Sequence, residues 1–364
     1  MRHRFHSICP YFAMFPESFA EKWIGLLTHK NDVVLDPFCG RGTTPFQAVL
    51  MGRQAIGCDI NPAAYCITKA KTNAPPLRSV LRRMTFLQAS YRPREWEHPR
   101  KRTPIFFRYA YHSETLRQIL YLRASLNWQS SNTDAMIAAL VLGSLHGESV
   151  KSRFYFSNQM PRTISTKPAY SIRFWMTRKM KAPERNVFEI LRNRSGFRYE
   201  SDVPQHNASV YMSDMRELPR LLPHARPKIR CVITSPPYLN VTNFEEDQWL
   251  RLWFLGGPPH PTYGVVSRDD RHERKEKYWD MIADFWRVMG NVLAPKAHVV
   301  IRLGAKGMFP DELKRGMCGT SVFSRRRVRL IRSEVSEIKG RQTDSFRPGS
   351  QGCLFEVDCC FSMQ

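Results

Sequence analysis

Two strand–turn–helix units follow one another near the N-terminus, and they constrain the fold more than any other feature. The apolar run DVVLDPF (32–38) predicts a buried strand, and TTPFQAVLMG (43–52) predicts a helix. AIGCDI (55–60) predicts a second strand, which NPAAYCITKAK (61–71) follows as a second helix. Because such units build parallel sheets with right-handed crossovers, we expect an α/β fold with a Rossmann-like, doubly wound sheet.

A basic block from about residue 73 to 205 interrupts this alternation. Helix start signals recur in it, at Ser113, Asp134 and Pro183. Residues 78–200 carry 23 basic and 8 acidic side chains, whereas residues 201–300 carry 13 and 12. Such a concentration of positive charge in one part of the chain is typical of nucleic-acid binding. We therefore expect a mostly helical, basic insertion.

The strand–helix alternation resumes after residue 205. Strands are expected over 209–214, 229–234 and 298–304, and two helices are expected between the last two of them. Apolar stretches near 328–338 and 353–361 predict a closing β-hairpin. The insertion therefore divides one α/β domain into two halves.

Composition limits the class of protein. A chain of 364 residues with 42% hydrophobic residues can bury a sizeable core, and its formal charge of +24 predicts a polyanionic partner. The nine cysteines include no CxxC pair and the eleven histidines show no ligand spacing, so we expect no metal and no disulfide framework. The longest apolar run, residues 135–145, is too short to span a bilayer. We expect a cytoplasmic protein without membrane association.

Glycines and carboxylates gather where the predicted strands end. DPFCGRGTT (36–44) lies between a strand and a helix, where glycines let the backbone approach a ligand. Asp59 ends the next strand, a position from which a carboxylate can accept hydrogen bonds from a ribose diol, and Asp214 ends the third. Each acid alone is equally compatible with a helix cap or a turn. Without a third glycine or a GKS or GKT sequence, the turn favours a nucleoside ligand that lacks a pyrophosphate.

The strand expected over 229–234 is followed directly by Ser235, Pro236, Pro237 and Tyr238. Proline has a fixed φ and no N–H, so the pair cannot continue a sheet ladder and holds the Pro236 carbonyl in one direction. A bare S-P-P-Y tetrapeptide is more often a turn with an aromatic plug. Its position after a strand, downstream of the glycine turn and Asp59, favours a role in a site.

DPFCGRGTT, GCDINP and TSPPY, in this order, resemble the S-adenosylmethionine-dependent amino-methyltransferases that modify exocyclic nitrogens of DNA bases. The resemblance covers about residues 8–72 and 205–305. It implies S-adenosyl-L-methionine as cofactor, with its methionine part against Asp36, Phe38, Gly40, Gly42, Thr43 and Thr44. It also implies that Asp59 binds the ribose, that Asp214 lies near the adenine, and that Phe15 in a Phe-Pro segment closes the methionine side.

The resemblance assigns a role to each part of the chain, in a motif order similar to the alpha class of that family. Residues 1–72 form the cofactor-binding half of the methyltransferase domain, and residues 206–364 form the catalytic half with the C-terminal β-hairpin. The helical basic insertion at 73–205 is the candidate target-recognition region.

Three local features of the chain stay open at this point. Arg41 stands where the family usually has Ser, and its side chain either touches the cofactor carboxylate or points outward. The runs SRFYFSNQMPRT (152–163) and YSIRFWMTRKMK (170–181) mix aromatic and basic residues, as nucleic-acid contact surfaces do. For any single aromatic in them, core packing is the more common role.

Methylation of an amino nitrogen must overcome the delocalisation of its lone pair into the base. Acceptors that take both amino protons let the nitrogen aim this lone pair at a sulfonium methyl. We assign that role to Ser235 and the Pro236 carbonyl, and we assign stacking of the flipped-out base to Tyr238. In the resembling family, Asp or Asn before Pro-Pro accompanies adenine N6 and Ser accompanies cytosine N4, so Ser235 favours N4. The Pro-Cys dipeptide of carbon-5 enzymes is absent from the sequence.

We therefore expect a site-specific, cytosine-N4-specific DNA methyltransferase that acts on double-stranded DNA. The expected setting is a restriction-modification system with a partner restriction endonuclease. The alternatives are an adenine-N6 DNA methyltransferase, an RNA N-methyltransferase and a catalytically silent nucleic-acid-binding subunit. No RNA-binding module is recognisable in the sequence, and the silent subunit is disfavoured by intact Asp36, Asp59, Ser235 and Tyr238.

Overall fold

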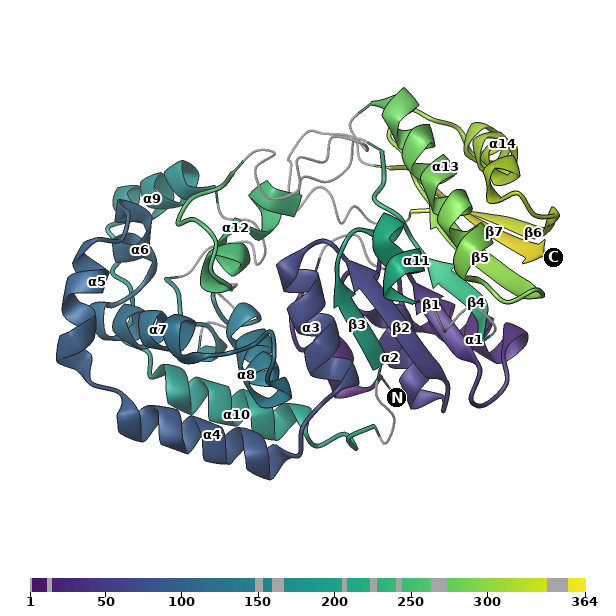
Figure 1. Cartoon of the computed structure of the whole chain (residues 1–364). Helices are drawn as coiled ribbons and strands as arrows, with labels where there is room; N and C mark the ends of the chain where they lie inside the picture. Colours follow the sequence, from purple (N-terminus) through teal and green to yellow (C-terminus); the bar gives the residue numbers. More distant parts are fainter. Residues whose placement is uncertain are drawn as a thin grey trace. The chain divides into compact units, whose positions relative to one another are not determined.

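The computed structural model describes residues 2–11, 15–147, 153–158, 167–204, 208–222, 228–239, 244–262, 274–338 and 353–364 (Figure 1). The chain forms two compact units. The α/β unit contains residues 12–68, 204–242 and 267–364, and the helical unit contains residues 1–11, 69–203 and 243–266. The helical unit thus includes two segments that lie outside the predicted insertion.

A seven-stranded sheet with the order β3-β2-β1-β4-β5-β7-β6 forms the centre of the α/β unit. Its strands are β1 (Val33–Asp36), β2 (Gln54–Asp59), β3 (Ala208–Met212), β4 (Ile229–Thr234), β5 (Ala297–Leu303), β6 (Val328–Glu337) and β7 (Phe355–Met363). The first five strands in the order pair in parallel, and β7 pairs antiparallel with both β5 and β6. This confirms the predicted doubly wound α/β fold and the antiparallel C-terminal pair.

The strand order reverses between β1 and β4. In open α/β sheets, ligands bind in the crevice outside the carboxyl ends of the strands at such a switch point. Asp36 ends β1 and Thr234 ends β4, so the glycine turn and the S-P-P-Y motif both leave the sheet there.

Helices cover both faces of the sheet, which explains why its strands read as continuous apolar runs. Val34 of β1 packs on one face with α1 (Glu17–Leu27) and α2 (Thr43–Leu50). Val33 and Leu35 pack on the other face with α11 (Leu218–Leu221), α13 (Lys275–Val292) and α14 (Pro310–Thr320). Along β1, alternate side chains therefore point to opposite faces, as the pleat of a strand requires.

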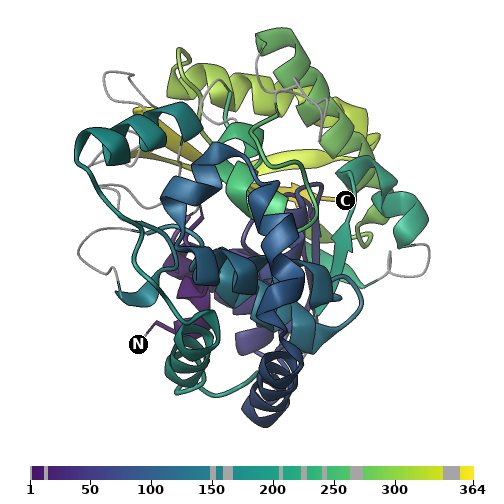
Figure 2. The ribbon, with the colours of Figure 1, turned by 90° about the vertical axis from the view of Figure 1, so that its left-hand side faces the viewer.

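The helical unit, whose helices are also drawn in Figure 2, contains most of the predicted insertion. Its helices are α4 (Leu77–Ser90), α5 (Glu97–Lys101), α6 (Ile105–Ala110), α7 (Ser113–Ser125), α8 (Asn132–Leu142), α9 (Pro168–Thr177), α10 (Val187–Arg198) and α12 (Phe244–Phe254). The remaining helix, α3 (Pro62–Thr72), crosses the boundary between the two units. The helix predicted to open at Pro183 begins at Val187 instead, because Asn186 caps it by accepting the Glu189 N–H at 3.2 Å.

Aromatic packing explains why residues 243–266 belong to the helical unit. The Trp249 ring of α12 lies 5.0 Å from the Phe106 ring, and the Trp253 ring lies 4.3 Å from the Phe107 ring. Arg123 also donates to the Trp253 carbonyl at 2.7 Å. Sequence periodicity identifies the helix but not the surface on which its apolar face packs.

The apolar run at 135–145 lies mostly in α8, where every residue from Asp134 to Leu142 is buried. It is a core helix of the helical unit, as its length predicts. Across the described parts of the chain, we find no helix whose length and apolarity would let it cross a bilayer.

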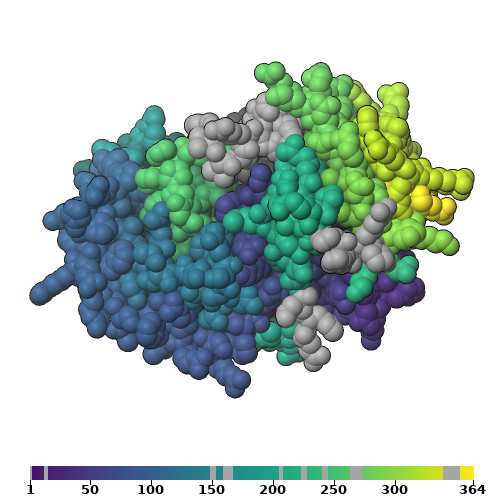
Figure 3. All heavy atoms as spheres, viewed as in Figure 1, coloured from purple at the N-terminus to yellow at the C-terminus, as the bar shows by residue number. Residues whose placement is uncertain are grey.

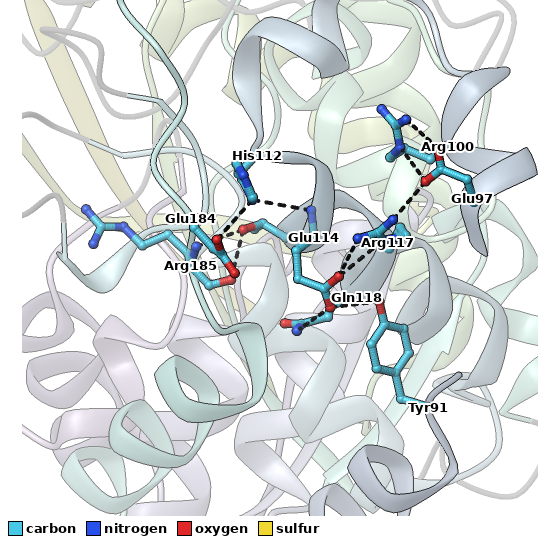
Figure 4. Close-up of polar contacts among 10 residues, drawn as sticks. Tyr91, Glu97, Arg100, His112, Glu114, Arg117, Gln118, Glu184 and Arg185 are labelled. Atoms are coloured by element: carbon cyan, nitrogen blue, oxygen red, sulfur yellow. Dashed lines mark hydrogen bonds and ion pairs between the residues drawn. The ribbon is translucent and has the colours of Figure 1, made fainter. Parts of the chain in front are cut away.

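A network of charged side chains fastens α5 to α7 (Figure 4). Arg117 donates to Glu97 at 2.8 Å and to Glu114 at 2.7 Å, and Arg100 donates to Glu97 at 2.6 Å. Tyr91 donates its hydroxyl proton to Glu114 at 3.0 Å. The hydrogen bond from Arg100, with others from Arg117, lowers the pKa of Glu97 to about 2. Both guanidinium groups are therefore matched by carboxylates within the protein.

A close approach between α13 and the 3-10 helix η5 (Ser321–Ser324) gives a test of this packing. A side-chain carbon at Gly290 would overlap the backbone oxygen of Ser324, which cannot move without η5. We expect Gly290→Ala to lower the free energy of unfolding by roughly 1–3 kcal/mol in urea denaturation. The control is Gly319→Ala in α14, where nothing lies within 4 Å and alanine should stabilise the helix by up to about 1 kcal/mol. Equal stability of Gly290→Ala and wild type would contradict this close approach.

Candidate functional site

A buried hydrogen bond joins the ends of β1 and β4 at the switch point. The Thr234 hydroxyl donates to Asp36 Oδ1 at 2.6 Å, and the Phe38 N–H donates to the same oxygen at 3.2 Å. Asp36 and Thr234 are 198 positions apart in the sequence. Desolvation raises the pKa of Asp36 to about 7, although both hydrogen bonds act to lower it. The structure thus brings the glycine turn and the S-P-P-Y motif together at one edge of the sheet.

Asp59 holds the glycine turn against the end of β2. Its Oδ2 accepts the Gly40 N–H at 2.8 Å, and its Oδ1 accepts the Asn61 N–H at 2.9 Å. Desolvation raises the pKa of Asp59 to about 6, and the two backbone donors oppose this rise. A carboxylate oxygen has two lone pairs, so each oxygen can accept a further hydrogen bond from a ligand.

The turn packs too tightly for a side chain at Gly42. Gly42 has a φ of 73° and precedes α2, and a side-chain carbon there would overlap Thr68. Thr68 also donates its hydroxyl proton to the Gly40 carbonyl at 3.0 Å. Thr43 and Thr44 follow as the first two residues of α2, and both are buried. Their N–H groups belong to the first turn, which has no acceptors within the helix.

Arg41 points inward. Its side chain is only 4% exposed, and its Nη2 lies 3.2 Å from Glu17 Oε1 at the start of α1. Phe15, in the predicted Phe-Pro segment just before α1, is buried with its ring 4.9 Å from the Phe19 ring. The ion pair therefore fastens the glycine turn to the segment that follows Phe15.

Asp214 occupies the capping role that the sequence left open. It accepts the Arg216 N–H at 2.9 Å at the start of a 3-10 helix, and the Arg216 guanidinium contacts both carboxylate oxygens at 3.1 Å. The Ser213 N–H donates to the Asp59 carbonyl at 3.1 Å, so the ends of β2 and β3 stay together. The Phe38 ring stacks on Phe285 of α13 at 6.3 Å. A contact between Asp214 and an adenine remains a prediction.

The S-P-P-Y motif leaves β4 beside the end of β5. Ser235 donates its hydroxyl proton to the Arg302 carbonyl at 3.0 Å, so its oxygen lone pairs can accept. Among the described residues, no backbone N–H donates to the Pro236 carbonyl. Tyr238 is only 8% exposed, and its hydroxyl donates to Glu356 Oε1 at 2.8 Å. Burial raises the pKa of the Tyr238 hydroxyl, and the Glu356 charge adds to this rise.

The burial of Tyr238 limits its predicted role. Its ring packs so closely on Gly304 that a side chain at that glycine would overlap it. Stacking of a base on Tyr238 therefore requires the ring to become accessible, and this role stays a prediction.

A charged cluster behind the motif was not found from the sequence. Arg302 of β5 binds both oxygens of Asp358 at 2.7 Å and lies 3.1 Å from Glu356, both on β7. Its guanidinium also lies 4.1 Å from the centre of the Phe19 ring. A signal was available, because charged residues inside apolar strands need partners. Antiparallel pairing of β5 with β7 sets Arg302 directly opposite Asp358.

No group of three or more His, Cys, Asp or Glu side chains in the described ranges is arranged to hold a metal ion. All nine cysteines are free thiols.

Comparison with known proteins gives matches that cover short parts of the chain. Residues 3–70 match a family model of the N6/N4 type, described as DNA methylase. "Type II methyltransferase M.MjaII" of Methanocaldococcus jannaschii is 36% identical over 66 residues, which cover 18% of this chain and 12% of that protein. "Orphan methyltransferase M.BamHII" of Bacillus amyloliquefaciens is 44% identical over 54 residues, covering 15% and 20%. The chain thus spans at most a fifth of either relative.

Solved structures give distant likenesses. TrmN from Thermus thermophilus has a TM-score of 0.40 at 12% identity, covering 100% of this chain and 53% of that one. The rRNA methyltransferase aviRa from Streptomyces viridochromogenes has a TM-score of 0.34 at 12% identity, covering 97% and 87%. Likenesses at this level say nothing about function.

Arg302 is largely buried, so the folded state tolerates its charge only because carboxylates bind it. Asp358→Asn would remove the better-aligned of the two carboxylates that bind the guanidinium while Glu356 remains, so we expect the unfolding free energy to fall by roughly 1.5–3 kcal/mol. The side chains of this pair are 12% and 8% exposed. The control is Glu217→Gln, which breaks the Arg220 pair with side chains 77% and 49% exposed, and should cost at most about 1 kcal/mol. Equal losses in urea denaturation would contradict a structural role for the buried pair.

Proposed function

We propose that this chain, whose residues 3–70 match a family model described as DNA methylase, is an S-adenosylmethionine-dependent DNA methyltransferase that acts on cytosine N4. The observation that carries the proposal is the Asp36–Thr234 hydrogen bond of 2.6 Å. It holds a glycine turn suited to a nucleoside and a proline corner suited to an amino group at one edge of the sheet.

The residues of the glycine turn fit S-adenosylmethionine. Gly40 and Gly42 have left-handed φ angles; the missing side chain at Gly42 makes room for Thr68, and at Gly40 it lets a ligand approach the backbone closely. Asp59 keeps acceptor capacity for a ribose diol at the end of β2. Asp36 places a desolvated carboxylate beneath the turn, which favours a cationic ligand. When bound, this cofactor supplies a methyl group made electrophilic by the sulfonium.

Ser235 and Pro236 supply the two acceptors that the chemistry needs. The Ser235 proton is committed to the Arg302 carbonyl, so toward a ligand this side chain acts through its lone pairs. The Pro236 carbonyl is held by the following Pro237, whose ring fixes the direction of the chain. Together they accept both protons of an exocyclic amino group, and the nitrogen lone pair is then free to attack.

Arg302 and Glu356 act as positioning residues. Arg302 fixes Glu356 through an ion pair of 3.1 Å, and Glu356 accepts the Tyr238 hydroxyl at 2.8 Å. The carbonyl of the same Arg302 accepts from Ser235. One residue of β5 thus orients both ends of the S-P-P-Y motif.

The choice of cytosine N4 rests on Ser235, a neutral side chain at the position where the resembling family has Asp or Asn in adenine-N6 enzymes. We further propose double-stranded DNA as the substrate, with Tyr238 stacking the flipped-out base and a partner restriction endonuclease. The type II name of the M. jannaschii relative supports the last point, and the orphan name of the B. amyloliquefaciens relative does not.

The reaction can be identified directly. The purified chain is incubated with methyl-tritiated S-adenosylmethionine and duplex DNA or RNA, and the digested nucleosides are separated by chromatography. We expect label in N4-methyl-2′-deoxycytidine from DNA, and Ser235→Ala should lower turnover roughly 100-fold because one acceptor is removed. The control is Ser209→Ala at an exposed position of β3. Label in N6-methyl-2′-deoxyadenosine or in RNA would overturn the stated specificity, and no label would overturn the proposed activity.

The raised pKa of Asp36 predicts a pH dependence of cofactor binding. A cationic ligand prefers the carboxylate, so affinity should rise between about pH 6 and pH 8 as Asp36 ionises around pH 7. One pH unit below that pKa, only about a tenth of the group is ionised, and affinity should be roughly tenfold weaker. The stability of the folded chain changes with pH in the direction opposite to cofactor affinity. Burial disfavours the carboxylate, so the free chain loses stability as pH rises from 3.8 to about 7.

Isothermal titration calorimetry with S-adenosylmethionine tests this dependence. Binding at pH 6.5 should release protons in wild type, and Asp36→Asn should bind more weakly and lose the upper part of the pH profile. The same variant should keep the lower part of the pH profile, because Asp59, with a pKa of about 6, is unchanged in it. A wild-type affinity that does not change from pH 6 to pH 8 would rule out an ionised Asp36 beneath the cofactor.

A further inference from the structure

Helix α9 of the helical unit presents a stripe of aromatic and cationic side chains. Tyr170, Phe174 and Arg178 are spaced four residues apart, so they share one side of the helix. The rings of Tyr170 and Phe174 lie 6.4 Å apart, and the Arg178 guanidinium lies 3.9 Å from the centre of the Phe174 ring. Tyr170 is 57% exposed. These three residues form the α9 stripe.

The packing of α9 does not use this stripe. Ser171 and Trp175 face the interior and are fully buried, and the Trp175 ring lies 5.7 Å from Phe106 of α6. A helix fixed through one side presents its remaining side chains on a rigid support. The α9 stripe therefore has a defined geometry before any ligand binds.

The charged side chains of the segment that carries the α9 stripe are all positive, and Lys167 at the start of α9 forms an ion pair with Glu246. Between Pro168 and Ala182 the sequence contains four basic residues and no acidic residue, namely Arg173, Arg178, Lys179 and Lys181, all exposed. Within the described part of the chain, no carboxylate forms an ion pair with any of the four. The cations of the α5–α7 network, in contrast, are paired (Figure 4). In Figure 3, α9 lies at the surface, at the place that its label marks in Figure 1.

The end of α9 keeps a cation where the backbone favours glycine. Lys179 has a φ of 50°, a left-handed conformation that lysine rarely adopts. Its N–H bonds to the Met176 carbonyl at 3.0 Å, and the Met180 N–H bonds to the Trp175 carbonyl at 2.9 Å. These bonds end the helix and place Lys179 directly after Arg178.

We propose that the α9 stripe and its neighbouring cations bind the substrate DNA. The exposed Tyr170 ring and the guanidinium that stacks on the half-buried Phe174 provide a surface for sugars, and the four cations without an ion pair among the described residues meet phosphates. Positive charge on these four residues complements a polyanion. The inference deepens the proposed function and rests on it, because it names the surface through which the same enzyme holds its substrate.

Fluorescence anisotropy with a short fluorescein-labelled DNA duplex of mixed sequence, without cofactor, tests this binding surface. The aromatic variant Tyr170→Ala/Phe174→Ala should bind roughly threefold more weakly, because it removes an exposed ring and the ring on which the Arg178 guanidinium stacks. The cationic variant Arg178→Gln/Lys179→Gln should lower the slope of log Kd against log salt by about 1 for each phosphate that the variant no longer neutralises.

The matched control is Arg82→Gln/Phe86→Ala on α4, which removes another exposed cation and an aromatic that is 60% exposed. It should bind as wild type does, and circular dichroism should show that all variants fold. Unchanged affinity in both α9 variants, an equal loss in the α4 control, or tighter binding of an RNA duplex than of DNA would each overturn the inference.

The methylation assay separates this inference from the proposed activity. If DNA is labelled normally and the α9 variants bind like wild type, the inference fails and the methyltransferase stands. The opposite outcome is that no nucleoside is labelled, while the α9 variants lose DNA affinity and the α4 control does not. The DNA-binding surface is then supported, and the proposed methyltransferase activity is wrong.

Discussion

The hydrogen bond between Thr234 and Asp36 is the interaction on which the site depends. A carboxylate buried to 1% exposure is costly unless it is hydrogen-bonded, and here the Thr234 hydroxyl and the Phe38 N–H provide the bonds. β1 and β4 lie next to each other in the sheet, at the point where the strand order reverses. The hydrogen bond can therefore form only when these two strands have paired. It therefore links correct topology to the assembly of the glycine turn beside the proline corner.

Local signals allowed much of this arrangement to be predicted from the sequence. Apolar runs bounded by glycine and proline located β1, β2, β4 and α2. They also placed Asp36 and Asp59 at the ends of their strands. The role of Arg41 could not be predicted, because it depends on Glu17 in another element. Arg302 was missed for a related reason. Its partner Asp358 reaches it only through the antiparallel register of β7, which follows from long-range pairing.

Net charge predicted a polyanionic partner but not the surface that binds it. The helical unit contains cations of two kinds. Arg100 and Arg117 form ion pairs with Glu97 and Glu114, and these pairs hold α5 against α7. Arg173, Arg178, Lys179 and Lys181 have no such carboxylates among the described residues, and Arg178 stacks on the Phe174 ring next to the exposed Tyr170. Counting charges treats both kinds alike, whereas the structure separates charge used for folding from charge available to a ligand.

The buried state of Tyr238 is compatible with a role in stacking. To accept a base, its ring must leave Gly304 and its hydroxyl must leave Glu356. A hydrogen bond to a charged group contributes about 1.5–3 kcal/mol, and stacking of one base contributes roughly 1–3 kcal/mol. The two terms are of equal size and opposite sign. Glu356 also keeps its ion pair with Arg302 at 3.1 Å when the hydroxyl leaves, so no buried charge is stranded. A closed ring without DNA and a stacked base with DNA can therefore be two states of one corner, provided that the base also replaces the packing that the ring loses at Gly304.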